Sequence, residues 1–362
     1  MNTNQIIIHL DAIVKNYQML QKWAGTDVRL MAVVKSDAYG HGMIPVAHAL
    51  CRAGCPQFAV FDGSEGLTLR DNGIEQPVLI LKGADPKNVD RIVEKNLIPA
   101  LFRLDMAQCL SKAAIKQNKQ AKVQIKVDSG MNRLGIYPED LDDFMRAIQK
   151  LPGLHINGFM SHFAVADQPE DAYTERQMQI FKEAISPYAN LTHHIANSGG
   201  IVDRKGLNYP IARAGIAIYG SSNSWPLAKQ LEPCMTFQSE VIYLKTVPRG
   251  ETISYGRTYT TKQPTRVATI PVGYADGYNR LLSNKAFVLI RGIRAPVIGR
   301  VCMNLIMVDV SNFENLKCGD PVVLLGKQGN DCITADELAS HANTISYEIM
   351  CLLGACNHRV YH

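Results

Sequence analysis

Eight short apolar runs alternate with helix-like segments over the first two-thirds of the chain, and this alternation restricts the fold more than any other feature. The expected strands span residues 30–34, 58–61, 77–81, 98–102, 122–127, 154–162, 191–196 and 209–213. The segments between them show the periodicity of amphipathic helices, as at 43–53, 86–96, 138–150 and 172–186. Continuous apolar runs joined by helices are typical of strands buried on both faces of a parallel sheet. Eight such units over about 210 residues predict a (β/α)8 barrel, preceded by a helix at 11–23.

The pattern changes near Ser224-Trp225-Pro226. Beyond it the apolar runs are β-branched, alternate with polar residues and are separated by Gly and Pro, which favours a mostly-β domain. The expected strands there are 237–244, 266–271, 286–290, 307–310 and 321–325. We therefore expect an α/β fold in which residues 1–232 form an N-terminal TIM-like barrel and residues 233–362 form a C-terminal mostly-β domain. The run at 5–10 could pair with either part.

Composition and charge exclude several classes of function. The formal net charge of +5 is mild and no basic cluster is interleaved with aromatic residues, so no nucleic-acid partner is expected. No apolar stretch approaches the roughly 20 residues of a membrane helix, and residues 1–5 lack the features of a signal peptide. The nine cysteines are scattered and lack metal-ligand spacing, so neither a disulfide framework nor a metal site is expected. A cytoplasmic protein that avoids membranes and acts on a small molecule fits these features.

Lys35 ends the first apolar run of the expected barrel, and the glycine-containing segment 36–42 follows it. A lysine at the carboxyl end of a barrel strand lies at the mouth where such proteins bind ligands. A partly desolvated lysine amine loses its proton readily and attacks carbonyl groups, which is the chemistry of a Schiff base. For an isolated lysine, a side chain that merely extends into water is the more common arrangement. The residues that follow the other strands decide between these two interpretations.

Polar residues follow several of the other expected strands. Arg133 follows the fifth strand, His162 ends the sixth, and Ser198 follows the seventh. The loops after the last two strands of a barrel commonly bind phosphate through backbone N–H groups and hydroxyls. Ser198 and the amides of Gly215 and Ile216 have the types of donor that this task needs. A lysine facing a phosphate pocket predicts a site for pyridoxal 5'-phosphate, bound covalently at one end and by its phosphate at the other.

The segment Val34-Lys35-Ser36-Asp37-Ala38-Tyr39-Gly40-His41-Gly42 closely resembles the pyridoxal-phosphate attachment signature of the bacterial alanine racemases. Further segments resemble that family, in family order and over nearly the whole chain. They are residues 126–135, 160–164, 196–198, 213–220, 253–256, 271–277, 299–303 and 345–348. One departure is Asn304, where an aspartate is usual in the family.

The resemblance implies a two-base interconversion of L- and D-alanine, which would supply D-alanine for peptidoglycan. Lys35 would bind the cofactor as an imine and act as one base, and Tyr255 of the partner subunit would act from the opposite face. One base would remove the α-proton while the other delivers a proton. A tyrosine with a pKa of about 10 is a weak base at neutral pH; the resemblance places His162 and Arg213 near it, where positive charge would lower that pKa. The working unit would be a homodimer with shared active sites.

The resemblance also assigns the surroundings of the cofactor and substrate. Arg213 would face the pyridine nitrogen, and because a guanidinium does not yield its proton, the ring would be a weaker electron sink. Arg133 would hold the substrate carboxylate, and the Met303 amide would lie near it. Lys126 matches a position that is carbamylated in many relatives, with an ordinary ion-paired lysine as the equal alternative. The other cofactor-binding residues would be Tyr39, His162, Ser198, Gly215, Ile216 and Tyr347, and the substrate entrance would be lined by Asp167, Tyr274, Arg280 and Arg300.

Three alternatives to an alanine racemase can be weighed from the sequence. A serine or broad-specificity racemase would keep the same fold; Tyr347 would crowd the substrate methyl group and favour alanine, although apolar pockets reject a hydroxyl poorly. A decarboxylase of basic amino acids on a related architecture is disfavoured by Ser254-Tyr255-Gly256 and by Arg213. A non-catalytic pyridoxal-phosphate carrier on the same barrel would lack the second domain that holds Tyr255.

Overall fold

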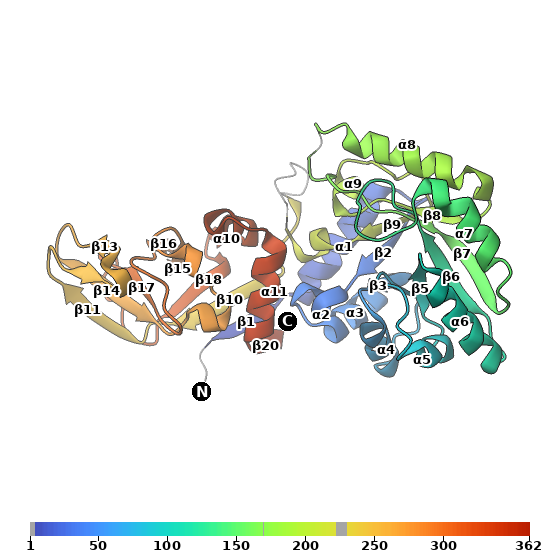
Figure 1. Ribbon diagram of the computed structural model, residues 1–362. Coiled ribbons are helices and arrows are strands. Elements are labelled where there is room, and N and C mark those ends of the chain that lie inside the picture. Colours follow the sequence, from blue (N-terminus) through green and yellow to red (C-terminus); the bar gives the residue numbers. More distant parts are fainter. Residues whose placement is uncertain (1–3, 169, 222–229) are drawn as a thin grey trace.

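The computed structural model describes residues 4–168, 170–221 and 230–362, and it divides them into two parts that lie side by side (Figure 1). One part is a barrel surrounded by helices, and the other is an elongated, strand-rich body that extends away from it. The change of pattern predicted near Ser224-Trp225-Pro226 lies outside the described residues. None of the helices in the described ranges combines the length and apolar character needed to cross a membrane.

Eight parallel strands form the barrel, as the sequence predicts. They are β2 (Arg29–Val33), β3 (Gln57–Val60), β4 (Val78–Ile80), β5 (Ile98–Leu101), β6 (Ala121–Lys126), β7 (Leu154–Met160), β8 (Thr192–His194) and β9 (Ile211–Ala214). Hydrogen bonds join them in the order β8-β7-β6-β5-β4-β3-β2-β9. The remaining gap lies between β8 and β9, where Arg213 N donates to Ala196 O at 3.0 Å. The sheet is therefore nearly closed, and the carboxyl ends of all eight strands meet at one mouth.

Helical segments precede and connect the barrel strands, and most of them cover the outside of the barrel. They are α1 (Leu10–Ala24), α2 (Lys35–Tyr39), α3 (Met43–Arg52), α4 (Gly63–Asp71), α5 (Val89–Glu94), α6 (Leu104–Lys116), α7 (Leu141–Ile148), α8 (Tyr173–Ile185) and α9 (Ser198–Val202). Helix α4 begins in a capping box, in which the Asp62 carboxylate accepts from Ser64 N and Glu65 N while Glu65 reaches back to Asp62 N. The helix predicted at 138–150 begins as a 3-10 turn (Pro138–Asp140) and becomes α-helical in α7.

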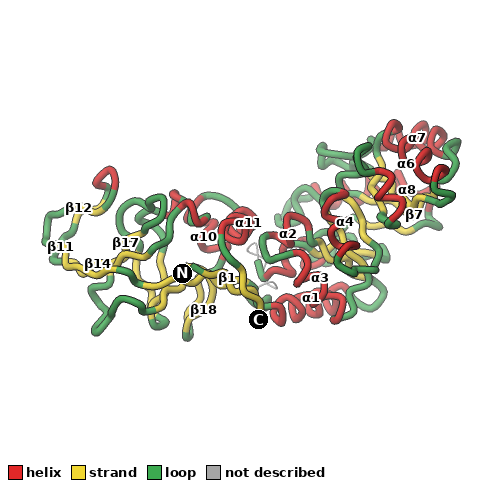
Figure 2. Tube along the Cα trace, turned by 90° about the horizontal axis from the view of Figure 1, so that it is seen from below, coloured by secondary structure: helices red, strands yellow, loops and turns green. Residues whose placement is uncertain are grey.

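The second part contains three sheets. Its strands are β1 (Gln5–Ile8), β10 (Met235–Glu240), β11 (Tyr243–Val247), β12 (Thr252–Ile253), β13 (Tyr259–Thr260), β14 (Thr265–Ile270), β15 (Phe287–Ile290), β16 (Ile293–Pro296), β17 (Ile306–Asp309), β18 (Pro321–Gln328), β19 (Asp331–Ile333) and β20 (Arg359–Tyr361). The largest sheet has the order β16-β15-β18-β10-β1-β20, with β19 on β18; β11-β14-β17 and β12-β13 form two smaller sheets. Figure 2 shows this part as mostly strand and loop. The predicted mostly-β domain is thus confirmed.

The structure answers one question that the sequence left open, and two details differ from the sequence-based expectation. The run at 5–10 is resolved in favour of the second part, because β1 pairs antiparallel with β10 and parallel with β20; residues 5–8 are therefore an exception to the division at 232. The single strand expected at 237–244 is two strands in different sheets, since Val241 N bonds to Asp320 O while Ile242 N bonds to Thr269 O. Two helices, α10 (Ala335–Ala342) and α11 (Ser346–Cys356), were not expected in this part.

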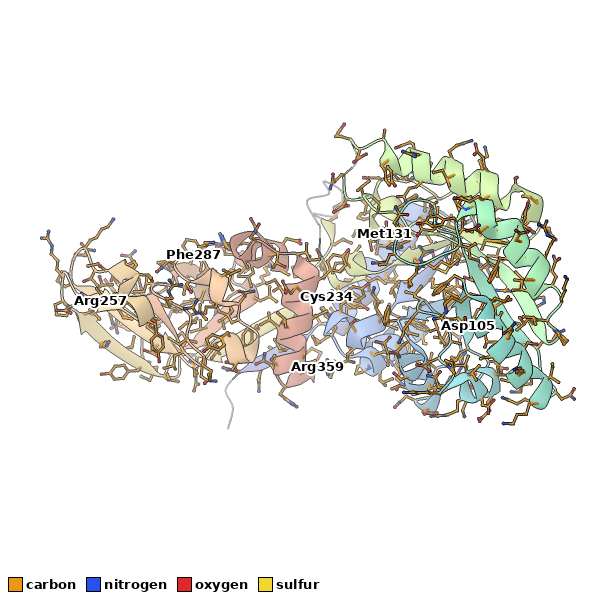
Figure 3. All side chains as sticks on the ribbon, viewed as in Figure 1. Asp105, Met131, Cys234, Arg257, Phe287 and Arg359 are labelled. Carbon is orange, nitrogen blue, oxygen red and sulfur yellow. The ribbon has the colours of Figure 1, made fainter. Side chains whose placement is uncertain are left out.

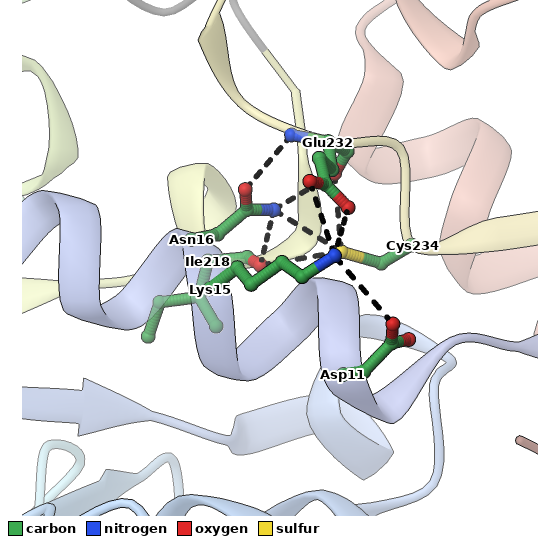
Figure 4. Close-up of polar contacts among 6 residues, drawn as sticks. All are labelled: Asp11, Lys15, Asn16, Ile218, Glu232 and Cys234. Atoms are coloured by element: carbon green, nitrogen blue, oxygen red, sulfur yellow. Dashed lines mark hydrogen bonds and ion pairs between the residues drawn. The ribbon is translucent and has the colours of Figure 1, made fainter.

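Where the chain leaves the barrel for the second part, at Glu232, it runs beside helix α1. Both polar atoms of the Asn16 side chain bond to its backbone there (Figure 4). Asn16 Oδ1 accepts from Glu232 N at 2.8 Å, and Asn16 Nδ2 donates to Glu232 O at 2.8 Å and to Ile218 O at 3.2 Å. Lys15 adds an ion pair to Glu232 at 3.3 Å. Because Asn16 is fully buried, these bonds tie the junction between the two parts to the barrel's first helix.

Candidate active site at the mouth of the barrel

Lys35 is followed by a left-handed turn of four residues. Ser36, Asp37, Ala38 and Tyr39 have φ values of 52°, 52°, 54° and 54°. Left-handed backbone costs roughly 1–2 kcal/mol for each non-glycine residue, so a run of four requires strong support. Part of that support comes from the barrel: Ser36 N donates to Glu65 Oε1 at 2.6 Å. The turn makes the chain reverse directly after Lys35, at the mouth of the barrel.

Five basic side chains gather at this mouth; we call them the basic cluster (Lys35, Lys126, Arg133, His162 and Arg213). Burial lowers the pKa of the Lys35 amine, and the charge of Arg133 lowers it further. Burial, with Arg213 and Arg133, lowers the pKa of Lys126 to about 8. Mutual repulsion of this kind is relieved by a bound anion. The cluster is therefore suited to a ligand that carries several negative charges.

Arg213 lies at the centre of the cluster and is 3% exposed. Its Nη2 donates to Ser161 O at 2.6 Å, to Ile195 O at 3.0 Å and to His162 Nδ1 at 3.1 Å, while its Nη1 donates to His194 Nδ1. Burial lowers the guanidinium pKa to about 9, which leaves it protonated at neutral pH. Arg213 Nε has no partner among the described residues, and so remains available to a ligand acceptor.

The Arg213 contacts fix the protonation of two histidines. Since a guanidinium only donates, Nδ1 of both His162 and His194 must accept, and each neutral ring carries its proton on Nε2. His194 Nε2 donates a hydrogen bond to Gln124 Oε1 at 2.6 Å. Burial first, and the Arg213 charge second, lower the pKa of both rings well below the usual value. His162 is thus neutral, and of the two residues expected to lend positive charge to a tyrosine base, only Arg213 carries a charge at neutral pH.

Tyr39, Ser198 and the segment after β9 converge beside the cluster. Ser198 Oγ accepts from Gly215 N at 3.0 Å and from Ala217 N at 3.3 Å. A Cβ placed on Gly215 would lie 2.8 Å from Tyr39 Oη, so only glycine leaves this space open. No described residue accepts a hydrogen bond from Ile216 N. Hydroxyls and amides grouped around an open space at a barrel mouth have the chemistry of a phosphate cradle.

Tyr347, on α11, completes this side of the site. Its ring centroid lies 5.8 Å from that of Tyr39. Burial raises the pKa of Tyr347 to about 12, and the charge of nearby Asp167 adds to the increase. The structure thus brings Tyr347 and Asp167 to the same mouth as Lys35, although Tyr347 comes from the far end of the sequence.

The other predicted site residues form a separate group on the second part. Tyr255, Arg300 and Met303 are joined through backbone and neighbouring contacts: Ser254 Oγ donates to Arg300 O at 2.8 Å, and Ala275 N donates to Met303 O at 3.0 Å. Tyr274 N donates to Cys302 O. Arg280 begins a 3-10 turn (Arg280–Leu282), and the next residue, Ser283, accepts from Val301 N at 3.0 Å.

This second group is exposed and distant from the basic cluster. The Tyr255 side chain is 73% exposed and that of Met303 is 56% exposed. Arg257 marks the end of the molecule that carries Tyr255, while Met131 marks the barrel loop that carries Arg133 (Figure 3). Figures 1 and 2 agree that β12 and β13 lie far from the barrel. Within one chain, Tyr255 therefore does not meet Lys35.

A cavity of about 230 Å³ lies at the opposite end of the barrel, away from this chemistry. Its lining includes Arg29, Gln57 and Ile211, which start their strands. The chemically suited surface is the mouth at the carboxyl ends of the strands, because Lys35, Arg213 and Ser198 lie there.

Sequence reasoning missed four residues that contact the site. Glu65 accepts from Ser36 N, Asp37 accepts from Met43 N at 2.6 Å, and His194 and Gln124 extend the Arg213 network. The signal for the last two was present, since a histidine and a glutamine interrupt apolar strands. Glu65 gave no such signal, because it lies in the first turn of a helix, where acidic residues are ordinary. Asp37 lies within the attachment signature, but the sequence assigned it no role.

The fold and the basic cluster define a class of proteins in which a (β/α)8 barrel with an anion-binding mouth carries a C-terminal β domain. Sequence models of the alanine racemase N-terminal and C-terminal domains match residues 8–223 and 234–361. An alanine racemase of Syntrophobacter fumaroxidans is 43% identical over 361 residues, covering 98% of this chain and 96% of that protein. The chain belongs to the alanine racemase family.

Solved structures agree. An alanine racemase from Bacillus anthracis with bound L-Ala-P has a TM-score of 0.90 and 33% identity, over 100% of this chain and 95% of that one. An alanine racemase from Bartonella henselae with covalently bound pyridoxal phosphate has a TM-score of 0.91 and 29% identity, over 100% of both chains.

The Arg213 network generates a prediction about pH. Both His162 and His194 should stay neutral, with the proton on Nε2, when the pH is lowered to 5.5, as read from the ring ¹⁵N shifts of labelled protein. In urea, where the network is lost, both should titrate near the ordinary value of about 6.5. Because the folded state binds fewer protons than the unfolded state, the melting temperature should fall as the pH drops below about 6.5. Titration of either ring near 6.5 in the folded protein would contradict the network.

Proposed function

We propose that this protein is a pyridoxal-phosphate-dependent alanine racemase that interconverts L- and D-alanine. The observation that carries the proposal is the basic cluster beside the Ser198–Gly215 cradle, at the mouth of a barrel of the alanine racemase family. In this proposal residues 1–232 bind the cofactor, and residues 233–362 contribute to the active site of a partner subunit. The reaction would take place in the cytoplasm and supply D-alanine for peptidoglycan.

The residues at the mouth fit the cofactor by chemistry and charge. Lys35 would carry it covalently, while Tyr39, Ser198, Gly215 and Ile216 would hold its phosphate. Arg213, whose Nε has no partner among the described residues, would face the ring nitrogen and leave it unprotonated. When bound, pyridoxal phosphate withdraws electrons from the amino acid and acidifies its α-proton. His162 and Tyr347 would complete the walls of the pocket.

Two bases would move the proton. The lowered pKa of Lys35 suits an amine that accepts a proton at the α-carbon. Tyr255 of the partner subunit would act on the opposite face, because Tyr255 of the same chain lies too far away. Arg213 keeps its positive charge at neutral pH and would stabilise the phenolate form of that tyrosine.

The substrate would be held by its carboxylate. Arg133 is exposed at the mouth and close enough to lower the pKa of Lys35 and of Lys126. The Met303 amide of the partner subunit would provide a second donor. Asp167, Tyr274, Arg280 and Arg300 would line the entrance, with Tyr274, Arg280 and Arg300 coming from the exposed group on the second part.

The function is tested by incubating the cofactor-loaded protein with L-alanine and, separately, L-serine in D₂O. We expect L-alanine to lose its optical rotation and to gain deuterium at the α-carbon, with serine much slower because Tyr347 crowds the site. Comparable rates on both would favour a broad-specificity racemase. Cofactor binding without α-proton exchange would favour a non-catalytic carrier and contradict the proposal.

The shared site is tested by mixing two inactive variants, Lys35→Ala and Tyr255→Phe. A hybrid dimer with shared sites has one site that carries both changes and one that is intact, so random mixing should restore about a quarter of the parental active sites. Each variant mixed with itself is the control and should stay inactive. If every site used residues of one chain only, the mixture would also stay inactive.

We propose that Lys126 is carbamylated. With its pKa near 8, about a tenth of its amine is neutral at pH 7 and can add CO₂. The product would replace a cation by an anion beside Arg133 and Arg213, and would so relieve the repulsion within the basic cluster.

Incubation with ¹³C-bicarbonate should give a carbamate signal in the NMR spectrum that Lys126→Met abolishes. Lys122 lies exposed on the same strand, and Lys122→Met is the matched control that should keep the signal. A parental protein without the signal would indicate the ordinary, unmodified lysine.

A further inference from the structure

The second part of the same chain contacts the left-handed turn that follows Lys35 through an ion pair and a hydrogen bond. Arg359, on the last strand β20, forms an ion pair with Asp37 Oδ2, and its Nη1 also donates to Gly40 O at 3.2 Å. One guanidinium therefore contacts a side chain within the turn and the carbonyl at its end. In Figure 3 Arg359 lies at the junction between the two parts.

Asp37 links the Arg359 contact to the barrel. Its Oδ1 accepts from Met43 N at 2.6 Å, at the start of helix α3, while its Oδ2 faces Arg359. Its backbone carbonyl accepts from Gly42 N at 2.8 Å. The side chain of one residue with left-handed backbone thus bonds to an element of each part. Both bonds depend on that backbone conformation and therefore stabilise it.

The packing around the ion pair leaves the turn little room to move. A Cβ on Gly354 of α11 would lie 2.0 Å from Gly40 O, and a Cβ on Gly42 would lie 2.1 Å from Tyr361 Oη. Helix α11 therefore touches the end of the turn at the level of the backbone, and strand β20 packs against it through the Tyr361 side chain. A turn bounded on one side by Glu65 and Met43 and on the other by α11 and Arg359 is held from both sides.

We propose that Asp37 and Arg359 are positioning residues that hold Lys35 in place for proton transfer. The proposal rests on the proposed function, in which Lys35 is one of the two bases. Without the ion pair, residues 36–39 would relax toward backbone conformations that non-glycine residues prefer, and Lys35, which directly precedes them, would move with them. Neither Asp37 nor Arg359 need touch the substrate for this effect.

The test uses the cofactor-loaded protein and four variants: Arg359→Gln, Asp37→Asn, their combination, and Arg359→Lys. We expect kcat per bound cofactor to fall about 10- to 100-fold in each of the first two, with little change in KM. The combination should be no worse than the more affected single variant, because both remove the same pair. Arg359→Lys keeps the charge and should recover most of the rate.

The matched control is Arg91→Gln. Arg91 pairs with Asp71 at 3.1 Å on the outer helices. The two carboxylates are about equally exposed, 49% for Asp71 and 50% for Asp37, while Arg91 is more exposed than Arg359, at 52% against 24%. Loss of this pair should leave kcat unchanged. The melting temperature of every variant is measured as well, so that a general loss of stability is separated from a loss of position.

An isotope effect distinguishes positioning from a general structural defect. If Lys35 is displaced, its proton transfer becomes slower than that of Tyr255, and the primary α-deuterium effect should grow for one enantiomer of alanine only. Equal growth for both enantiomers, additive losses in the combined variant, or a parental rate in Arg359→Gln would each overturn the proposal. An inactive parental protein would instead overturn the proposed function, so the two failures are distinguishable.

Discussion

The buried guanidinium of Arg213 is the interaction on which the site depends. Arg213 stands at the seam where the eight-stranded sheet nearly closes, and its backbone N–H bonds across that seam to Ala196 O. Its side chain bonds to the carbonyls of Ser161 and Ile195 in the loops after β7 and β8. The backbone of Arg213 thus helps to close the barrel, while its side chain orients the loops that form the site. Removing this buried guanidinium would lower the stability of the fold, because the carbonyls of Ser161 and Ile195 would lose their hydrogen-bond donor.

Local sequence pattern predicted the barrel well and the second part less well. Strands such as β3, β4 and β5 are short and mostly apolar, so they can be predicted from the sequence pattern, whereas β8 (Thr192–His194) follows from the regular alternation of strands and helices around it. The strand expected at 237–244 shows the limit of that approach. Its residues are uniformly suited to strands, and the split at Val241 and Ile242 follows from which distant strand supplies each acceptor. Helix α11 was missed because it is apolar on most sides, which obscures the helical period.

The sequence predicted which barrel residues meet at the mouth, but not their protonation or the contacts that hold them there. Strand-end position brought Lys35, Arg133, His162, Ser198 and Arg213 together correctly, since parallel strands share one mouth. Sequence could not show that His162 is neutral, because this depends on burial and on the donor-only chemistry of Arg213. It also gave no sign of Asp37 or Arg359, which are separated by most of the chain and meet only once both parts have folded.

The pairing of β1 has a consequence for how the molecule is assembled. Strand β1 lies between β10 and β20, so the large sheet of the second part includes residues from both ends of the described chain, and the barrel is inserted between them. On the ribosome, residues 5–8 emerge before the barrel but gain their two sheet neighbours only after residues 235–240 and 359–361 have been made. The barrel, whose strands are contiguous in sequence, can form in the meantime. The large sheet of the second part, and with it the Arg359 contact with the Lys35 turn, can therefore form only after β20 has been made.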